Sequence, residues 1–150
     1  MKILRPDGVE VYLGSLFDQV YSMEDTDGRQ YHWSVTQARQ LAETRGTLWT
    51  VSLSEIGITC EFIHAQYQGL DEAHAMTRDL RLPLLFVPFG ESHQLIDGWH
   101  RLFKAAAMGV DVLPAWCLSQ EDADASLVLE LAPGQGLDWG QNASPTERST

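Results

Sequence analysis

The segment at residues 95–109, LIDGWHRLFKAAAMG, combines side chains that could bind an anion with others that could move a proton. Asp97 stands at the expected start of a helix, where its carboxylate could accept hydrogen bonds from N–H groups two or three residues later. Gly98 has no side chain and would let a ligand approach the backbone closely. The arrangement predicts a helix N-terminus suited to a phosphate or another small anion.

Two side chains on the first turn of this helix add donors. Arg101 would supply a forked, permanently charged group that suits phosphate oxygens. His100 could donate a hydrogen bond and exchange a proton near neutral pH. Lys104, one turn further on, could reach the same ligand or only solvent. The simpler interpretation is an ordinary cap at Asp97 with surface residues behind it, and spacing alone does not separate the two.

Apolar segments on both sides are expected to position this junction. A strand is predicted over residues 82–89, LPLLFVPF, and a turn at 90–92 returns the chain as a partner strand over 93–96. The helix then runs to Gly109, and a further strand follows over 110–119. The junction is therefore expected where the second strand of a hairpin ends and a helix begins.

The rest of the chain indicates a mixture of strands and helices. Further strands are expected at 2–5, 9–13, 19–23, 29–33 and 47–53, and further helices at 35–45, 70–81 and 119–131. Residues 54–69 are only partly helical in pattern. This order predicts an α+β fold.

The charge balance restricts the partners of the chain. Ten Lys and Arg residues stand against 21 Asp and Glu residues, which gives a net charge of -11. Binding to nucleic acid or to an anionic membrane surface depends on clustered basic residues, so neither is expected. A small anion needs only a few local donors and remains compatible with the sequence.

The remaining features favour a cytoplasmic protein. The N-terminus lacks the long apolar stretch of a secretory signal, and no segment approaches the length of a membrane span. Cys60 and Cys117 are too few for a disulfide framework and are expected to be reduced residues of the core. Cys60 and His64 lie one helical turn apart, but no second pair supports a zinc site.

A longer segment, residues 93–119, resembles the signature region of the ParB/sulfiredoxin superfamily. The shared pattern is a strand ending in Asp-Gly, a His/Arg-Arg pair, a helix with small residues and a strand with Pro. The resemblance implies a ParB/sulfiredoxin-like domain over 47–132, with a small mixed sheet flanked by helices. It leaves a strand-rich extension at 1–46 and a flexible tail at 133–150. It also implies nucleotide or phosphate binding at 97–101.

Two branches of the superfamily match the junction poorly. Sulfiredoxins carry a catalytic cysteine immediately before the His-Arg pair, where this chain has Trp99. Chromosome-partitioning ParB proteins carry a Gly-Glu-Arg-Arg-x-Arg box, of which only Gly98 and Arg101 match, and Phe103 replaces the last arginine. Sulfinic acid reduction and a partition clamp are therefore not expected.

The free-serine kinases of the superfamily carry Asp-Gly-His-His-Arg, from which this chain departs only at Trp99. That resemblance implies Mg²⁺ with ATP, ADP or CTP, and a base that accepts the proton of an attacking hydroxyl. Glu61 is the first candidate for the base, and Glu55 is the second. His100 and Arg101 would neutralise charge.

In this interpretation Asp97 would cap the helix or contact the metal, and Trp99 would stand at the mouth of the site. The expected function is nucleotide or phosphate binding, with phosphotransferase or nucleotide hydrolase activity if the protein is an enzyme. The alternative is a non-catalytic module whose N-terminal region and acidic C-terminal helix bind a protein partner.

Overall fold

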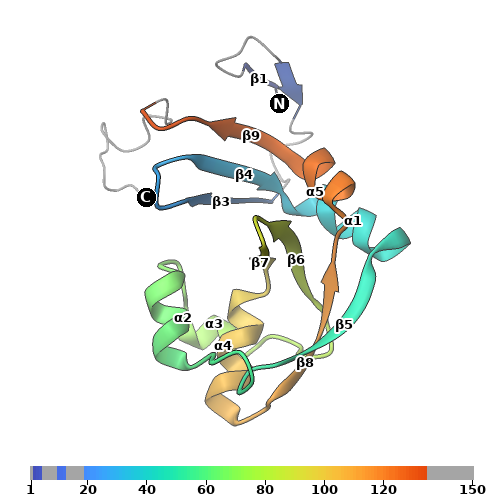
Figure 1. Ribbon diagram of the computed structural model, residues 1–150. Helices are drawn as coiled ribbons and strands as arrows, with labels where there is room; N and C mark the ends of the chain where they lie inside the picture. Colours follow the sequence, from blue (N-terminus) through green and yellow to red (C-terminus); the bar gives the residue numbers. More distant parts are fainter. Residues whose placement is uncertain (1, 5–9, 13–18, 135–150) are drawn as a thin grey trace. The chain divides into compact units, whose positions relative to one another are not determined.

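The computed structural model describes residues 2–4, 10–12 and 19–134, and their fold is α+β, as predicted (Figure 1). The contacts divide the chain into two units. One unit comprises residues 1–34 together with 127–150, and the other comprises residues 35–126. Nearly all of the tail predicted as flexible, including Trp139, lies outside the described residues.

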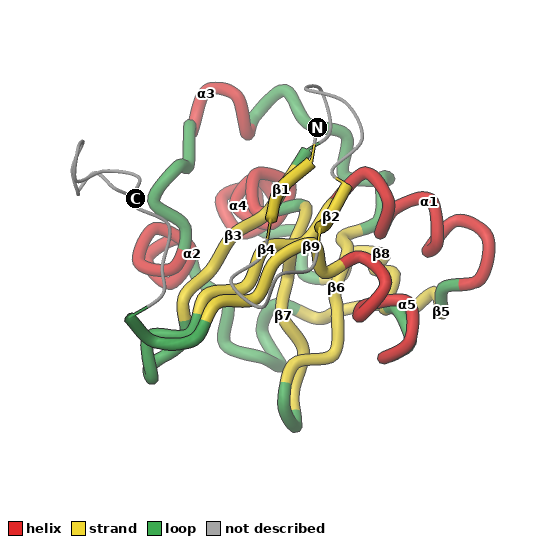
Figure 2. The backbone as a smooth tube through the Cα atoms, turned by 90° about the horizontal axis from the view of Figure 1, so that it is seen from above, coloured by secondary structure: helices red, strands yellow, loops and turns green. Residues whose placement is uncertain are grey.

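The first unit is made of strands. β1 (Lys2–Leu4) and β2 (Glu10–Tyr12) pair antiparallel. A second, three-stranded antiparallel sheet has the order β3 (Val20–Glu24), β4 (Gln30–Ser34) and β9 (Leu127–Leu131). Figure 2 shows these three strands side by side. The strand predictions for this unit are confirmed.

One helix prediction is wrong in its second half. The expected helix over 119–131 ends early, because α5 covers only Gln120–Ser126 and the chain continues directly as β9. The segment LVLEL pairs antiparallel with β4 and buries Val128, Leu129 and Leu131. Pairing with a strand about a hundred positions earlier therefore decides the conformation, which a local pattern cannot reveal.

The second unit is built on a four-stranded sheet in the order β5-β8-β6-β7. β6 and β7 form an antiparallel hairpin, β8 lies parallel to β6, and β5 closes the other edge antiparallel to β8. The strands are β5 (Thr47–Ser52), β6 (Leu84–Phe89), β7 (Ser92–Asp97) and β8 (Val112–Cys117). The helices are α1 (Val35–Arg45), α2 (Cys60–Gln66), α3 (Glu72–Ala75) and α4 (Trp99–Met108), followed by α5.

The core of this unit forms between α4 and the β6–β7 hairpin. Leu85 and Ile96 are almost fully buried on the strands, and α4 buries Leu102, Phe103 and Ala105. Leu102 and Ala105 are three positions apart and therefore lie on one face of α4, which is buried. α2 and α3 pack against the same helix.

The helix predicted over 70–81 is also too long, since α3 covers only Glu72–Ala75. Asp71 caps it by accepting from the N–H of His74 at 3.1 Å. The hydroxyl of Thr77 donates to the carbonyl of His74 at 2.7 Å just after the helix. Polar side chains thus satisfy backbone groups at both ends of the one-turn helix α3. The chain then continues without further helix, as non-helical turns.

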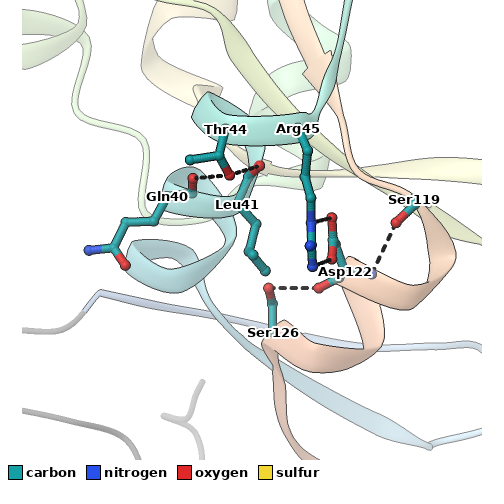
Figure 3. A network of polar contacts seen from close by, with 7 residues as sticks. All are labelled: Gln40, Leu41, Thr44, Arg45, Ser119, Asp122 and Ser126. Carbon is teal, nitrogen blue, oxygen red and sulfur yellow. Dashed lines mark hydrogen bonds and ion pairs between the residues drawn. The ribbon is translucent and has the colours of Figure 1, made fainter.

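A buried carboxylate joins α1 to α5 (Figure 3). Asp122 is 3% exposed and receives Nε of Arg45 at 2.8 Å, with a second bond from Nη2. Ser119 accepts from the N–H of Asp122, and Ser126 donates to its carbonyl. Hydrogen bonding from Arg45 is the main reason that the pKa of Asp122 is lowered. This contact fixes α1, whose Arg39 reaches the site described next.

Candidate anion-binding site at the start of α4

The start of α4 differs from the predicted cap. Gly98, not Asp97, is the N-cap residue, with φ of 112°, and no side chain caps the helix. The first helical bond runs from the N–H of Leu102 to the carbonyl of Gly98 at 2.8 Å. The N–H groups of residues 99–101 therefore have no partner inside the helix. The capping role expected for Asp97 is wrong, and its carboxylate is used elsewhere.

Asp97 binds two arginines from different helices. Nη2 of Arg39, on α1, lies 2.6 Å from Oδ2 of Asp97, and Nη2 of Arg101, on α4, lies 3.7 Å from the same oxygen. Both Nη2 atoms also donate to the carbonyl of Pro83, at 3.3 Å and 3.2 Å. Two guanidinium groups thus converge on one carboxylate oxygen and one neutral carbonyl.

Arg101 is buried and incompletely compensated. The residue is 4% exposed, and its Nε has no hydrogen-bond partner. Burial lowers the pKa of Arg101; the charge of Asp97 opposes that shift, while Arg39 and Arg78 add to it. A buried charge is stable only with adequate pairing, so Arg101 depends on its contacts with Asp97 and with the carbonyl of Pro83.

Gly98 makes room for this arrangement. A Cβ atom there would lie 2.6 Å from Cδ2 of Leu84 and 3.0 Å from Nη2 of Arg101. The guanidinium group of Arg101 therefore folds back against the start of its own helix. The close approach at Gly98 is made by the chain's own side chains, whereas the sequence predicted the approach of a ligand.

His100 has a different chemical state from the one expected. Its Nε2 accepts the backbone N–H of Asp71 at 3.1 Å, which places the proton of the neutral ring on Nδ1. Burial lowers the pKa of His100, and the neighbouring His74 lowers it further. A neutral imidazole at pH 7 offers one N–H donor and does not neutralise the charge of a phosphate.

Trp99 lies inside the fold. The sequence predicts it at the mouth of the site instead, and the structure differs from that expectation. The residue is 8% exposed, and Tyr67 stacks on it with ring centroids 5.6 Å apart and planes 2° apart. The ring of His100 lies at the same centroid distance from Tyr67, nearly perpendicular to it. Nε1 of Trp99 has no hydrogen-bond partner. One face of the indole is thus covered by Tyr67.

The candidate bases are not brought to this cluster. Glu61 is exposed in the first turn of α2, and among the described residues no hydrogen bond or ion pair joins it to the start of α4. His64, on the next turn of α2, contacts the ring of Phe103 and pairs with Glu72. Glu55 is exposed in the turn after β5. The described contacts give neither glutamate a partner at the site.

Lys104 has a structural contact. Its Nζ donates to the carbonyl of Arg78 at 2.7 Å and ties the segment after α3 to α4. Sequence reasoning missed three residues that surround the junction: Arg39, Tyr67 and Arg78. None belongs to a motif near residues 97–101, so no local signal could have identified them.

The residues at the site do not fit a protein-held Mg²⁺ ion. Within the described ranges, no group of three or more His, Cys, Asp or Glu residues could hold a metal ion. Asp97 is the carboxylate at the junction, and a cation beside it would face the guanidinium groups of Arg39 and Arg101.

No protein-family model, curated protein or solved structure matches the chain. Among the helices that the structure describes, none has the length and apolar character needed to cross a membrane.

Proposed function

We propose that this chain is a ParB/sulfiredoxin-like domain that binds the phosphate of a nucleotide or small molecule at the start of α4. One observation carries the proposal: Arg101 is buried with an unpartnered Nε, and its guanidinium group lies against an uncapped helix N-terminus. Free N–H groups, the helix dipole and a fixed arginine are the groups that favour an anion.

Phosphate binding is the primary part of the proposed function, and catalysis would require a further group. As a phosphotransferase or nucleotide hydrolase, the protein would need a base, and Glu61 is exposed on α2, where the described contacts do not join it to the junction. Phosphoryl transfer otherwise depends mainly on positioning and charge stabilisation, which the arginines and N–H groups would supply. Equal turnover by Glu61→Gln and the parent would remove Glu61 from such a mechanism.

The test is a titration with ATP, ADP and CTP, each with Mg²⁺, followed by calorimetry and thermal unfolding. A ligand present at roughly 100 times its dissociation constant should stabilise the fold by about 2.7 kcal/mol. Arg101→Lys keeps the charge but loses the fork and should weaken binding. Arg81→Gln removes one charge from an exposed side chain and serves as the control. No stabilisation by any nucleotide would count against the proposal.

A second candidate, a non-catalytic interaction module, is favoured by β5. This strand forms an edge of the four-stranded sheet, and Leu48 and Trp49 on it are 63% and 39% exposed. Exposed apolar edge strands are used for pairing with other chains. Cross-linking to a protein partner that is lost in Leu48→Lys, together with absent nucleotide binding, would favour this candidate.

A further inference from the structure

We infer that Arg39, on α1, is a specificity-determining residue of the anion site, and that Arg39 and Arg101 together select a ligand group with two negative charges. The ligand class is a phosphate monoester or a terminal phosphate. The inference rests on the proposed function. It adds Arg39, which lies outside residues 97–101, and a requirement for the charge of the ligand.

The first step is the shared carboxylate. Arg39 and Arg101 both direct Nη2 to Oδ2 of Asp97, and their other common acceptor is the uncharged carbonyl of Pro83. One negative charge therefore serves two guanidinium groups. Two arginines that share one carboxylate would be stabilised by an additional anionic acceptor.

The second step is the local charge count. The guanidinium groups of Arg39 and Arg101 face the single carboxylate of Asp97. The pair therefore carries two positive charges and receives one negative charge. A ligand group of charge −2 that takes the place of the Asp97 carboxylate balances both charges, whereas a monoanion in that place leaves one positive charge uncompensated. This excess exists in a chain whose net charge is -11, so it is a local feature.

The third step is access. The side chains of Arg39 and Asp97 are 25% and 21% exposed, while that of Arg101 is 5% exposed. An incoming anion would thus reach the Arg39 side of the pair first. The guanidinium carbon of Arg39 also lies 5.8 Å from the ring centre of Trp116, a cation–π contact that restricts its position. Arg39 is consequently held in place before a ligand arrives.

These steps give Asp97 the role of an internal counter-ion. Its carboxylate occupies the donors that a phosphate would use. Phosphate oxygens would compete with it for Arg39 and Arg101. Removing the charge with Asp97→Asn should therefore strengthen anion binding, the reverse of what a metal-binding or capping role predicts.

The experiment is calorimetry of the full chain at about pH 7.5 with inorganic phosphate, sulfate and nitrate. Inorganic phosphate is more than half dianionic at this pH, because its second pKa lies below about 7.5, and phosphate monoesters ionise at still lower pH. Phosphate and sulfate should bind, and nitrate should bind at least about tenfold more weakly. Arg39→Gln should weaken phosphate binding about tenfold or more, which corresponds to one lost charge-assisted hydrogen bond.

Matched variants make the result specific. Arg39→Lys keeps the charge but loses the fork, and should fall between the parent and Arg39→Gln. Arg81→Gln removes an exposed charge that pairs with Asp79 and should bind phosphate like the parent. Circular dichroism and the unfolding midpoint establish that each variant is folded. The nitrate comparison uses the parent protein and needs no variant.

The outcomes separate this inference from the proposed function. If the parent binds phosphate and the folded Arg39→Gln or Arg39→Lys variant binds it equally well, the role of Arg39 is wrong and the proposed function stands. Nitrate binding as tight as sulfate binding would overturn the charge requirement alone. If the parent binds neither these anions nor any nucleotide, the proposed function fails, and the inference fails with it.

Discussion

His100 accepts the backbone N–H of Asp71 through Nε2 at 3.1 Å and thereby connects the first turn of α4 to the start of α3. The contact requires an unprotonated Nε2, because an imidazolium ring has only donors. Tyr67 and His74 place their rings against the same imidazole. His100 thus holds the segment between α2 and α3 against α4. Protonation of its Nε2 would remove the hydrogen bond from Asp71.

The first prediction concerns the pH dependence of stability. Burial lowers the pKa of His100 below its ordinary value of 6.5. The unfolded chain therefore binds a proton in a pH range where the folded chain does not. The free energy of unfolding should be fully retained above about pH 6.5 and should fall as pH decreases from there toward the folded-state pKa. Urea unfolding between about pH 5 and 8 measures this.

His100→Asn should reduce the slope of that curve. Part of the slope should remain, because burial also lowers the pKa of His32 in the other unit. NMR of the imidazole nitrogens at neutral pH should find the His100 proton on Nδ1. A proton on Nε2 at pH 7, or an unchanged slope in His100→Asn, would contradict the hydrogen bond from Asp71 to a neutral His100.

The second prediction concerns the pair between α1 and α5. Arg45→Ala should lower the unfolding midpoint, because it leaves the buried carboxylate of Asp122 without its charged donor. The pKa of Asp122 is lowered mainly by that donor, so the stabilisation is present above pH 3.8 and lost as pH falls through the folded-state pKa. The variant should therefore differ from the parent most at neutral pH.

Arg81→Ala is the matched control for this pair. Arg81 also binds an aspartate through two nitrogens, but its side chain is 91% exposed. Exposed pairs are screened by solvent, so the unfolding midpoint should hardly change. Equal losses in Arg45→Ala and Arg81→Ala would show that burial of Asp122 does not matter.

The third prediction concerns Gly98. Gly98→Ala should destabilise the protein by about 1–3 kcal/mol, since it combines a positive φ with a Cβ that would collide with Leu84. Gly57→Ala also changes a glycine of positive φ, but no atom lies within 4 Å of its Cβ position. It should cost less. Chemical unfolding of both variants measures the difference, and equal losses would rule out the close approach.

The fourth prediction tests the core that supports the site. Leu85 is 0% exposed, so Leu85→Ala should lower the free energy of unfolding by about 2–5 kcal/mol. Leu48→Ala makes the same change at a residue that is 63% exposed and should shift stability by less than about 1 kcal/mol. A small effect of Leu85→Ala would place the core elsewhere than between the β6–β7 hairpin and α4.

Much of the local structure could be predicted from the sequence. The β6–β7 hairpin, α4 and its end at Gly109, and α1 followed by β5 occur where their patterns indicate. These elements have clear periodicity and turn residues, which act over a few positions. The helices expected at 70–81 and 119–131 were too long because side-chain caps and pairing with β4 decide them.

The sequence by itself determined the α+β class and the concentration of Asp97, Gly98, His100 and Arg101 at one helix start. Only the tertiary structure decided what each group contacts. Asp97 pairs with Arg39, 58 positions away, and His100 with Asp71, 29 positions away. The physical reason is that charge pairing and burial depend on distance in space, whereas helix and turn preferences depend on neighbours along the chain.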